Sequence, residues 1–298
     1  MRIVVFGNQE ICIESLELLR KYDAEIALVV GCETEADMKF GYHSVSEYCK
    51  THDIPFEQPE VLDEEFTKRI ESLKPDICFS FYFRKVFKKD LIDIPPMGFI
   101  NLHPSHLPQY RGPAPTMWAL LNGEQKTGVT LHYIDYGVDT GDIIGQRSYE
   151  IPSDITGFAL NDQGMKEGFL LIQDEMPKIL NKTNDRTIQT DIGASYYGQF
   201  KSVVSHINWL QKSRDIYNQV RVLTKPYAGA RAKIKDQEVI IWRVALDVKP
   251  LHNAFGPGRI MDLSADGSFM VSTVNGYLRV LDYEGDKELI VPGERFTI

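Results

Sequence analysis

Two kinds of apolar segment alternate along the first hundred residues, and this alternation constrains the fold more than any other feature. Short, mainly apolar runs typical of strands cover positions 2–6, 26–30, 77–82 and 98–102, and the first of them is β-branched. Segments with apolar residues near helical spacing lie between them, at 10–22, 45–52 and 63–73. Strands that alternate with helices in this way build βαβ units. The pattern therefore predicts an α/β fold with a mostly parallel sheet that carries helices on both faces.

The pattern changes after about residue 151. We expect a long helix at 157–180, a polar stretch with linker composition at 181–191, and a helix at 206–223. Five short alternating segments follow, separated by Gly, Asp-Gly and Asn-Gly turns: RAKI, EVIIWRV, GRIMDL, SFMVST and YLRVLDY. They predict a small C-terminal β-barrel of the OB type. The expected parts are a catalytic domain at 1–190, a linker at 191–205, and a helix with the β domain at 206–298.

The distribution of charge argues against a nucleic-acid partner. The chain has a net charge of −9, and residues 205–298 carry 13 Lys and Arg against 11 Asp and Glu. A protein that grips a polyphosphate backbone usually has a basic face, because phosphate contacts supply most of its affinity. Here the barrel region is nearly neutral and the rest is acidic, so we expect no nucleic-acid partner.

Other features predict a cytoplasmic protein without a membrane partner. No apolar run approaches the roughly 20 residues that span a bilayer. The N-terminus, MRIVVFGNQE, has the pattern of a first strand and not of a secretory signal. The four cysteines form no C-x-x-C pair and are typical of buried reduced thiols.

Residues that make poor regular structure but good active sites gather after two expected strands. The segment NLHPSHLPQYRGP begins at Asn101, and the segment DYGVDTGD follows a strand expected at 128–134. Open α/β sheets place their ligands at the carboxyl edge of parallel strands. Taken singly, Asn101 also suits a turn, and the Asp-rich segment also suits a hairpin or a calcium-like loop.

Two common kinds of site are not expected. Pro104 breaks any helix between His103 and His106, and no third ligand has suitable spacing, so the sequence predicts no metal site. The turn after the first strand, GNQE, lacks the G-x-G-x-x-G spacing that lets the backbone approach a dinucleotide.

Taken together, these segments are specific. The run FINLHPSHLPQYRGPAPTMWALLNGEQKTGVTLHYIDYGVDTGDI resembles the signature of the folate-dependent formyltransferase family. The resemblance covers nearly the whole chain, including the tract VRVLTKPYAGA, which is similar to the entry into the barrel domain of longer members. It implies that Asn101, His103 and Asp139 are the catalytic residues. It also implies 10-formyltetrahydrofolate as co-substrate, without a metal.

The chemistry of formyl transfer explains these residue types. An amide such as that of Asn101 stabilises the negative oxygen that forms when an amine attacks the formyl carbon. His103 can carry the proton from the attacking nitrogen toward the leaving folate nitrogen. Asp139 can orient the imidazole, stabilise its charged form and hold a water for proton relay.

The resemblance also bears on the acceptor. The tract SFYFR at 80–84 is similar to the S-F-Y-Y-R tract of sugar-nucleotide formyltransferases, and the overall layout is most similar to modules that act on UDP-4-amino-4-deoxyarabinose in lipid A modification. The tract CETEADMKFGY at 32–42 is acidic where the tRNA-specific enzyme carries a basic insertion. We therefore expect a dTDP- or UDP-linked 4-amino-deoxysugar as acceptor, in surface polysaccharide or lipopolysaccharide biosynthesis.

By the same resemblance, one set of residues is expected to bind the folate: Arg84, Lys85, Val86, Asp135 and Gly137. A second set is expected to contact the acceptor: Asn8, Gln9, Tyr82, Ser105, Tyr110 and Arg111. Tyr82 equally suits a core aromatic at a strand end, and Arg111 equally suits a structural salt bridge.

Three alternatives remain open. The chain suits a methionyl-tRNA formyltransferase, a nucleic-acid-binding barrel protein with an inactive front domain, or a formyltetrahydrofolate hydrolase. The sequence does not identify the nucleotide, the sugar or the position of the amine, and it leaves a homodimer open.

Overall fold

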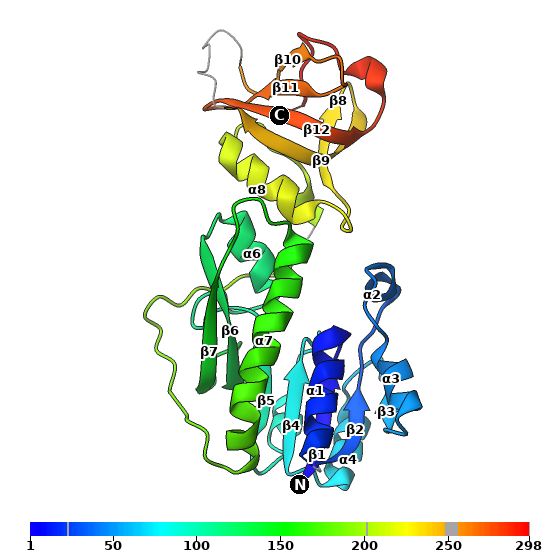
Figure 1. The fold of residues 1–298 in the computed structure, drawn as a ribbon, viewed down its shortest axis with the longest axis vertical. Coiled ribbons are helices and arrows are strands. Elements are labelled where there is room, and N and C mark those ends of the chain that lie inside the picture. Colours follow the sequence, from blue (N-terminus) through cyan, green and yellow to red (C-terminus); the bar gives the residue numbers. More distant parts are fainter. Residues whose placement is uncertain (23, 201, 248–255, 298) are drawn as a thin grey trace. The chain divides into compact units, whose positions relative to one another are not determined.

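The computed structural model describes residues 1–22, 24–200, 202–247 and 256–297 (Figure 1). Parts of the predicted linker and C-terminal domain, namely residues 201, 248–255 and 298, lie outside this description. The chain forms two compact units. The first unit consists of residues 1–115, 127–149 and 163–197, and the second consists of 116–126, 150–162 and 198–298.

A seven-stranded sheet forms the centre of the first unit, in the order β3-β2-β1-β4-β5-β6-β7 (Figure 1). The strands are β1 (Arg2–Gly7), β2 (Glu25–Val30), β3 (Phe56–Glu57), β4 (Ile77–Phe81), β5 (Phe99–His103), β6 (Lys126–Tyr133) and β7 (Ile143–Glu150). The first five strands pair in parallel, and β6 pairs antiparallel with β5. The predicted α/β class with a mostly parallel sheet is confirmed.

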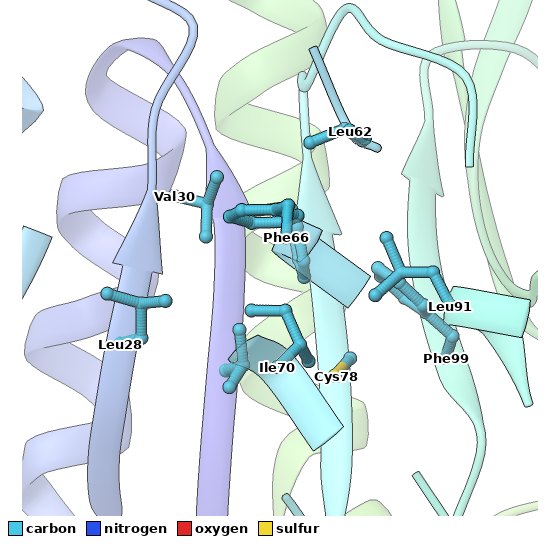
Figure 2. Close-up of a cluster of buried hydrophobic side chains, with 10 residues drawn as sticks. Leu28, Val30, Leu62, Phe66, Ile70, Cys78, Leu91 and Phe99 are labelled. Carbon is cyan, nitrogen blue, oxygen red and sulfur yellow. The ribbon is translucent and has the colours of Figure 1, made fainter. Parts of the chain in front are cut away.

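Helices cover both faces of this sheet. The helices of the first unit are α1 (Gln9–Lys21), α2 (Glu35–Lys39), α3 (Val45–Thr51), α4 (Glu64–Leu73), α5 (Lys89–Ile92) and α7 (Gly157–Leu180), whose first turns belong to the second unit. Figure 2 shows Phe66 and Ile70 of α4 packed over apolar side chains of the strands, among them Leu28 and Cys78. Helices α1 and α7 lie on the opposite face (Figures 1 and 2).

The strand order places several loops at one edge. The chain leaves β1 in one direction to build β2 and β3, then returns past β1 to build β4 and β5. Ligands bind at such a reversal point in open α/β sheets, outside the carboxyl ends of the strands. The loops after β1, β4 and β5 therefore frame the candidate site.

The second unit contains a five-stranded antiparallel sheet in the order β10-β11-β12-β9-β8. Its strands are β8 (Ala230–Ile234), β9 (Gln237–Asp247), β10 (Ile260–Leu263), β11 (Phe269–Ser272) and β12 (Tyr277–Glu284). Residues near the C-terminus bridge the two edge strands: Glu294 accepts from the N–H of Ile260, and the N–H of Thr297 donates to Lys233. These bonds give the sheet the closed character of the expected small barrel.

Short helices accompany this second sheet. They are α6 (Pro115–Leu121), α8 (Ser213–Leu223) and the two 3₁₀ turns Ser202–Ser205 and Lys287–Leu289. The helix expected at 206–223 begins only at Ser213, because the backbone before it pairs with β8: the N–H of Ile207 donates to Arg231. Within the described parts of the chain, no helix is long and apolar enough to cross a membrane.

The polar stretch after α7 differs from the expected linker. Residues 187–197 belong to the first unit and hydrogen-bond to its other segments, as in the pair of backbone bonds between Thr187 and Ile143. Polar composition predicted a free connection because the partners of these polar groups lie far away in the sequence. The domain boundary at residue 190 stays a prediction.

Candidate active site

The end of β5 presents two polar side chains on one face of the sheet. Asn101 and His103 are two residues apart on an extended strand, so their side chains point to the same side. The register of the sheet sets Asn101 between Ser80 of β4 and His132 of β6. The predicted oxyanion donor and the predicted proton carrier are therefore neighbours where the parallel strand ends.

Both ring nitrogens of His103 face oxygen atoms. Nε2 lies 2.9 Å from the carbonyl oxygen of Tyr110, and Nδ1 lies 3.6 Å from Oδ2 of Asp139. Because a carbonyl oxygen only accepts, Nε2 carries a proton and donates it. Nδ1 is therefore the nitrogen that can take up and release a second proton, beside a carboxylate that stabilises the charged ring. The ring is 4% exposed, which shields this proton from bulk water.

Asp139 lies on the loop between β6 and β7. Its Oδ2 accepts a hydrogen bond of 2.8 Å from the N–H of Gly112, and its Oδ1 lies 3.8 Å from Nε2 of His132. Burial raises the pKa of Asp139, but His103, His132 and the Gly112 N–H together outweigh burial and hold this pKa below its usual value. Asp139 is therefore ionised at neutral pH.

His132 is a site residue that the sequence did not single out. Burial, with a smaller contribution from His103, lowers the pKa of His132 from 6.5 to about 4 against the opposing effect of Asp139, so the ring is neutral at pH 7. Its Nδ1 lies 2.7 Å from the carbonyl oxygen of Tyr133 and donates to it. Nε2 is then an acceptor, 3.2 Å from Nδ2 of Asn101. This bond fixes the orientation of the Asn101 amide and leaves its second N–H available.

The signal for His132 was present in the sequence, in the pattern of β6. Once β5 and β6 are paired, the register brings His132 beside Asn101. The family resemblance singled out residues of β5 and of the loops. It did not single out His132, because that residue's place beside Asn101 follows only from the antiparallel pairing of β5 with β6.

The residues expected to bind the folate lie on the segments 84–86 and 135–137, and Tyr136 of the second segment contacts α5, which follows the first. The hydroxyl of Tyr136 donates to Asp93 at 2.7 Å and accepts from Lys89 at 2.5 Å, which ties the 135–137 loop to the segment after β4. A cavity of about 410 Å³ lies beside this contact. Its lining includes Asp135 but none of residues 84–86.

The side chains of these folate candidates differ in what they contact. Arg84 pairs with the buried Asp37, and Lys85 donates to the carbonyl oxygen of Glu60 at 2.7 Å. Val86 is 89% exposed and offers an apolar surface. Asp135 accepts from the N–H of Gly137 at 3.1 Å, a turn that shapes the loop. Their folate contacts stay predictions.

Several of the residues expected to contact the acceptor make hydrogen bonds to other groups of the protein. Asn8 is fully buried and bonds to the backbone of Cys32 through both amide atoms. Gln9 donates to Asp37, and the buried Ser105 donates to the carbonyl oxygen of Gln109. In this arrangement these side chains shape the loops around the site and do not face solvent, so their substrate contacts stay predictions.

The two tyrosines expected to contact the acceptor both have a left-handed backbone. Tyr82 adopts a left-handed backbone, with φ of 56°, directly after β4. Tyr110 also has a positive φ and stacks on Tyr197, with ring centroids 4.8 Å apart.

Arg111 is 1% exposed and has the contacts of a loop anchor. Its guanidinium donates to Oε1 of Gln189, to Asp191 and to the hydroxyl of Tyr196. Of the two roles that the sequence allowed, this geometry fits the structural one, because no donor is left facing solvent for a pyrophosphate. Among the described residues, no group of three or more His, Cys, Asp or Glu side chains is arranged to hold a metal ion.

The neutral state of His132 gives a testable pH dependence. The unfolded chain binds a proton at this histidine near pH 6.5, whereas the folded protein resists it down to about pH 4. The free energy of unfolding should therefore fall as the pH drops through this interval. His132→Gln keeps an acceptor for Asn101 but cannot titrate, so we expect a smaller fall between pH 7 and pH 5 in urea unfolding. Equal falls in both proteins would contradict a buried neutral ring.

Comparison with known proteins agrees with this geometry. The family model "Formyl transferase" matches residues 1–185, and the model of the formyl transferase C-terminal domain matches residues 201–297. A methionyl-tRNA formyltransferase of Acetivibrio thermocellus is 36% identical over 274 residues, which are 90% of this chain and 86% of that protein. The bifunctional polymyxin resistance protein ArnA of Wigglesworthia glossinidia brevipalpis is 33% identical over 266 residues, which are 89% of this chain and 40% of that protein.

Among solved structures, an N-formyltransferase of Helicobacter canadensis, in complex with folinic acid and dTDP-3-aminofucose, has the same fold. The TM-score is 0.74 at 24% identity, and the match covers 95% of this chain and 99% of that one. The matches of both family models and of the full-length relative agree with the fold and with the signature around β5. The chain belongs to the formyl transferase family.

Proposed function

We propose that this protein transfers the formyl group of 10-formyltetrahydrofolate to the primary amine of a nucleotide-linked amino sugar. The observation that carries the formyl transfer is the convergence of Asn101, His103 and Asp139 at the end of β5. Family membership supports the reaction class. The folate and the amino-sugar nucleotide named with the Helicobacter canadensis structure support the choice of both substrates.

The proposed reaction uses each of the three groups once. The amine nitrogen attacks the formyl carbon, and negative charge develops on the formyl oxygen, where the free N–H of Asn101 donates. His103 takes the proton that the attacking nitrogen must lose, and Asp139 stabilises the charged ring. The bond between the formyl carbon and the folate nitrogen then breaks, and that nitrogen receives the proton that His103 took up. The products are the N-formyl sugar and tetrahydrofolate.

The edge of the sheet next to this site favours a small acceptor over a polynucleotide. The segment after β2 carries Glu33, Glu35 and Asp37, and Asp37 neutralises Arg84 by an ion pair. Burial raises the pKa of Asp37, but the hydrogen bonds and charge of Arg84 and the hydrogen bonds from Thr34 outweigh burial and lower this pKa to about 2, so the carboxylate stays charged. Carboxylates at this place repel the phosphates on which tRNA affinity depends. A single nucleotide diphosphate needs far fewer phosphate contacts.

A second candidate is methionyl-tRNA formyltransferase activity. It is favoured by the identity of 36% to the Acetivibrio thermocellus protein of that name, which the chain matches over most of its length. The acceptor amine of methionyl-tRNA would undergo the same attack at the same three residues.

The choice of acceptor can be tested directly. We expect purified protein with 10-formyltetrahydrofolate to release tetrahydrofolate in the presence of a dTDP- or UDP-linked amino-deoxysugar, and mass spectrometry to find the formylated sugar. Methionylated initiator tRNA should give no comparable product, and filter binding should detect no appreciable tRNA affinity at physiological salt. Efficient formylation of the tRNA with no reaction of any sugar nucleotide would establish the second candidate instead.

The role of the catalytic carboxylate gives a further prediction. Asp139→Asn keeps an oxygen that accepts from Gly112 but removes the charge beside His103. We expect turnover to fall by about 10²–10⁴, as when the carboxylate partner of a catalytic histidine is neutralised. Asn101→Ala should lose about 10²–10³ through the missing oxyanion donor. Near wild-type turnover in either folded variant, at saturating substrates, would remove that residue from the mechanism.

A further inference from the structure

A segment far along the chain crosses the two loops that carry the candidate site. We call residues 187–197 the strap. At its start, Thr187 and Ile143 exchange backbone hydrogen bonds of 2.8 and 2.9 Å. At its end, the N–H of Arg111 donates to Ser195 at 2.8 Å, and the N–H of Tyr197 donates to Arg111 at 2.9 Å. The strap is thus fixed to the loop after β5 and to the first residue of β7.

Gln189 of the strap joins the same two loops through its side chain. Its Oε1 accepts from Nη2 of Arg111 at 2.8 Å and from Nε at 3.3 Å. Its Nε2 donates to the carbonyl oxygens of Asp139 at 2.9 Å and of Gly141 at 2.7 Å. Both ends of the amide are used in full. One side chain therefore links the loop that contains Gly112 to the loop that contains Asp139.

Both loops need such a link because their backbones are in constrained conformations. Asp139 has φ of 55° and Tyr110 has φ of 58°. These values lie in the left-handed region of the backbone, which residues other than glycine rarely adopt. A Cβ at Gly141 would lie 2.0 Å from the carbonyl oxygen of Tyr133, so the loop passes very close to β6. Such conformations persist only where the surroundings hold them.

Arg111 needs the link for a second reason. Its guanidinium is buried, and a buried charge is stable only when its donors have partners. The carboxylate partner of Arg111, Asp191, has a side chain that is 90% exposed, whereas Gln189 is partly buried and makes two hydrogen bonds with the guanidinium. Gln189 thus serves a buried cation on one side and two backbone carbonyls on the other.

We propose that Gln189 is a positioning residue for formyl transfer: through the two carbonyls it holds the 139–141 loop so that the Asp139 carboxylate meets both Gly112 and His103. This inference rests on the proposed role of Asp139 in catalysis. It assigns a function in the active site to a segment whose composition is that of a linker.

The selective variant is Gln189→Glu. A glutamate keeps an acceptor for Arg111, so the buried guanidinium stays partnered and the protein folds, but it has no donor for Asp139 and Gly141. Gln189→Met, of similar length, removes both contacts. Thr190→Ala, an exposed neighbour on the strap, is the matched control.

We expect kcat for formyl transfer to fall by about 10- to 100-fold in Gln189→Glu, because small displacements of a catalytic group cost this much. KM values should change less than about threefold, and the control should match the wild type. A purely structural role would lower the melting temperature and leave kcat of the folded protein unchanged. Unchanged kcat in folded Gln189→Glu overturns the proposal.

A second readout separates this inference from the choice of acceptor. Amide hydrogen exchange, followed by mass spectrometry on peptides that contain Gly112, reports the bond from its N–H to Asp139 without any substrate. We expect faster exchange in Gln189→Glu and in Gln189→Met than in the control. Unchanged exchange overturns the proposal, whatever acceptor the wild type uses. Absence of activity on every amino-sugar nucleotide, together with faster exchange, would count against the proposed acceptor and leave the positioning role supported.

Discussion

A carboxylate buried among loops is stable only where donors and positive charge surround it, and Asp139 finds them in separate parts of the chain. Gly112 supplies an N–H from the loop after β5, and His103 on β5 supplies a ring that is positively charged when protonated. Each of these contacts also restrains its partner. The loop after β5 is held against the 139–141 loop, and His103 is held between Tyr110 and the carboxylate. The arrangement of the site thus depends on keeping this one charge in place.

The two histidines beside Asp139 are identical side chains with different tasks. His132 is buried deeply enough to stay neutral and acts as an acceptor that orients Asn101. His103 places Nδ1 toward Asp139, where a proton can be taken up beside a negative charge. An oxyanion donor needs a fixed orientation, whereas a proton carrier needs a charge that balances its protonated form. The register of β5 against β6 provides both from adjacent strands.

Much of the fold followed from apolar periodicity, because a strand or helix is largely decided by residues close together in sequence. The segments 26–30, 45–52 and 157–180 correspond closely to β2, α3 and α7. The catalytic candidates came from their positions at the end of β5 and in the loop after β6 and from the family signature, and the structure does bring Asn101, His103 and Asp139 together.

What the sequence did not reveal depends on contacts between distant segments. The neutral state of His132 arises from burial, which periodicity does not measure. The guanidinium of Arg111 donates to Gln189, which lies 78 residues away in a polar stretch that composition alone assigns to a linker. The same limit applies to Asn8, whose position at the end of β1 suggested a ligand contact. Its amide joins two loops of the protein through the backbone of Cys32, and its substrate contact stays a prediction.

The central claim is that Asn101 donates to the formyl oxygen while His103 takes the proton of the attacking amine. A crystal structure with a non-transferring formyl folate and an amino-sugar nucleotide tests it most directly. The account predicts the formyl oxygen within about 2.7–3.1 Å of Nδ2 of Asn101, with the acceptor amine on the side of His103. A formyl group bound in well-defined density away from both residues would contradict it.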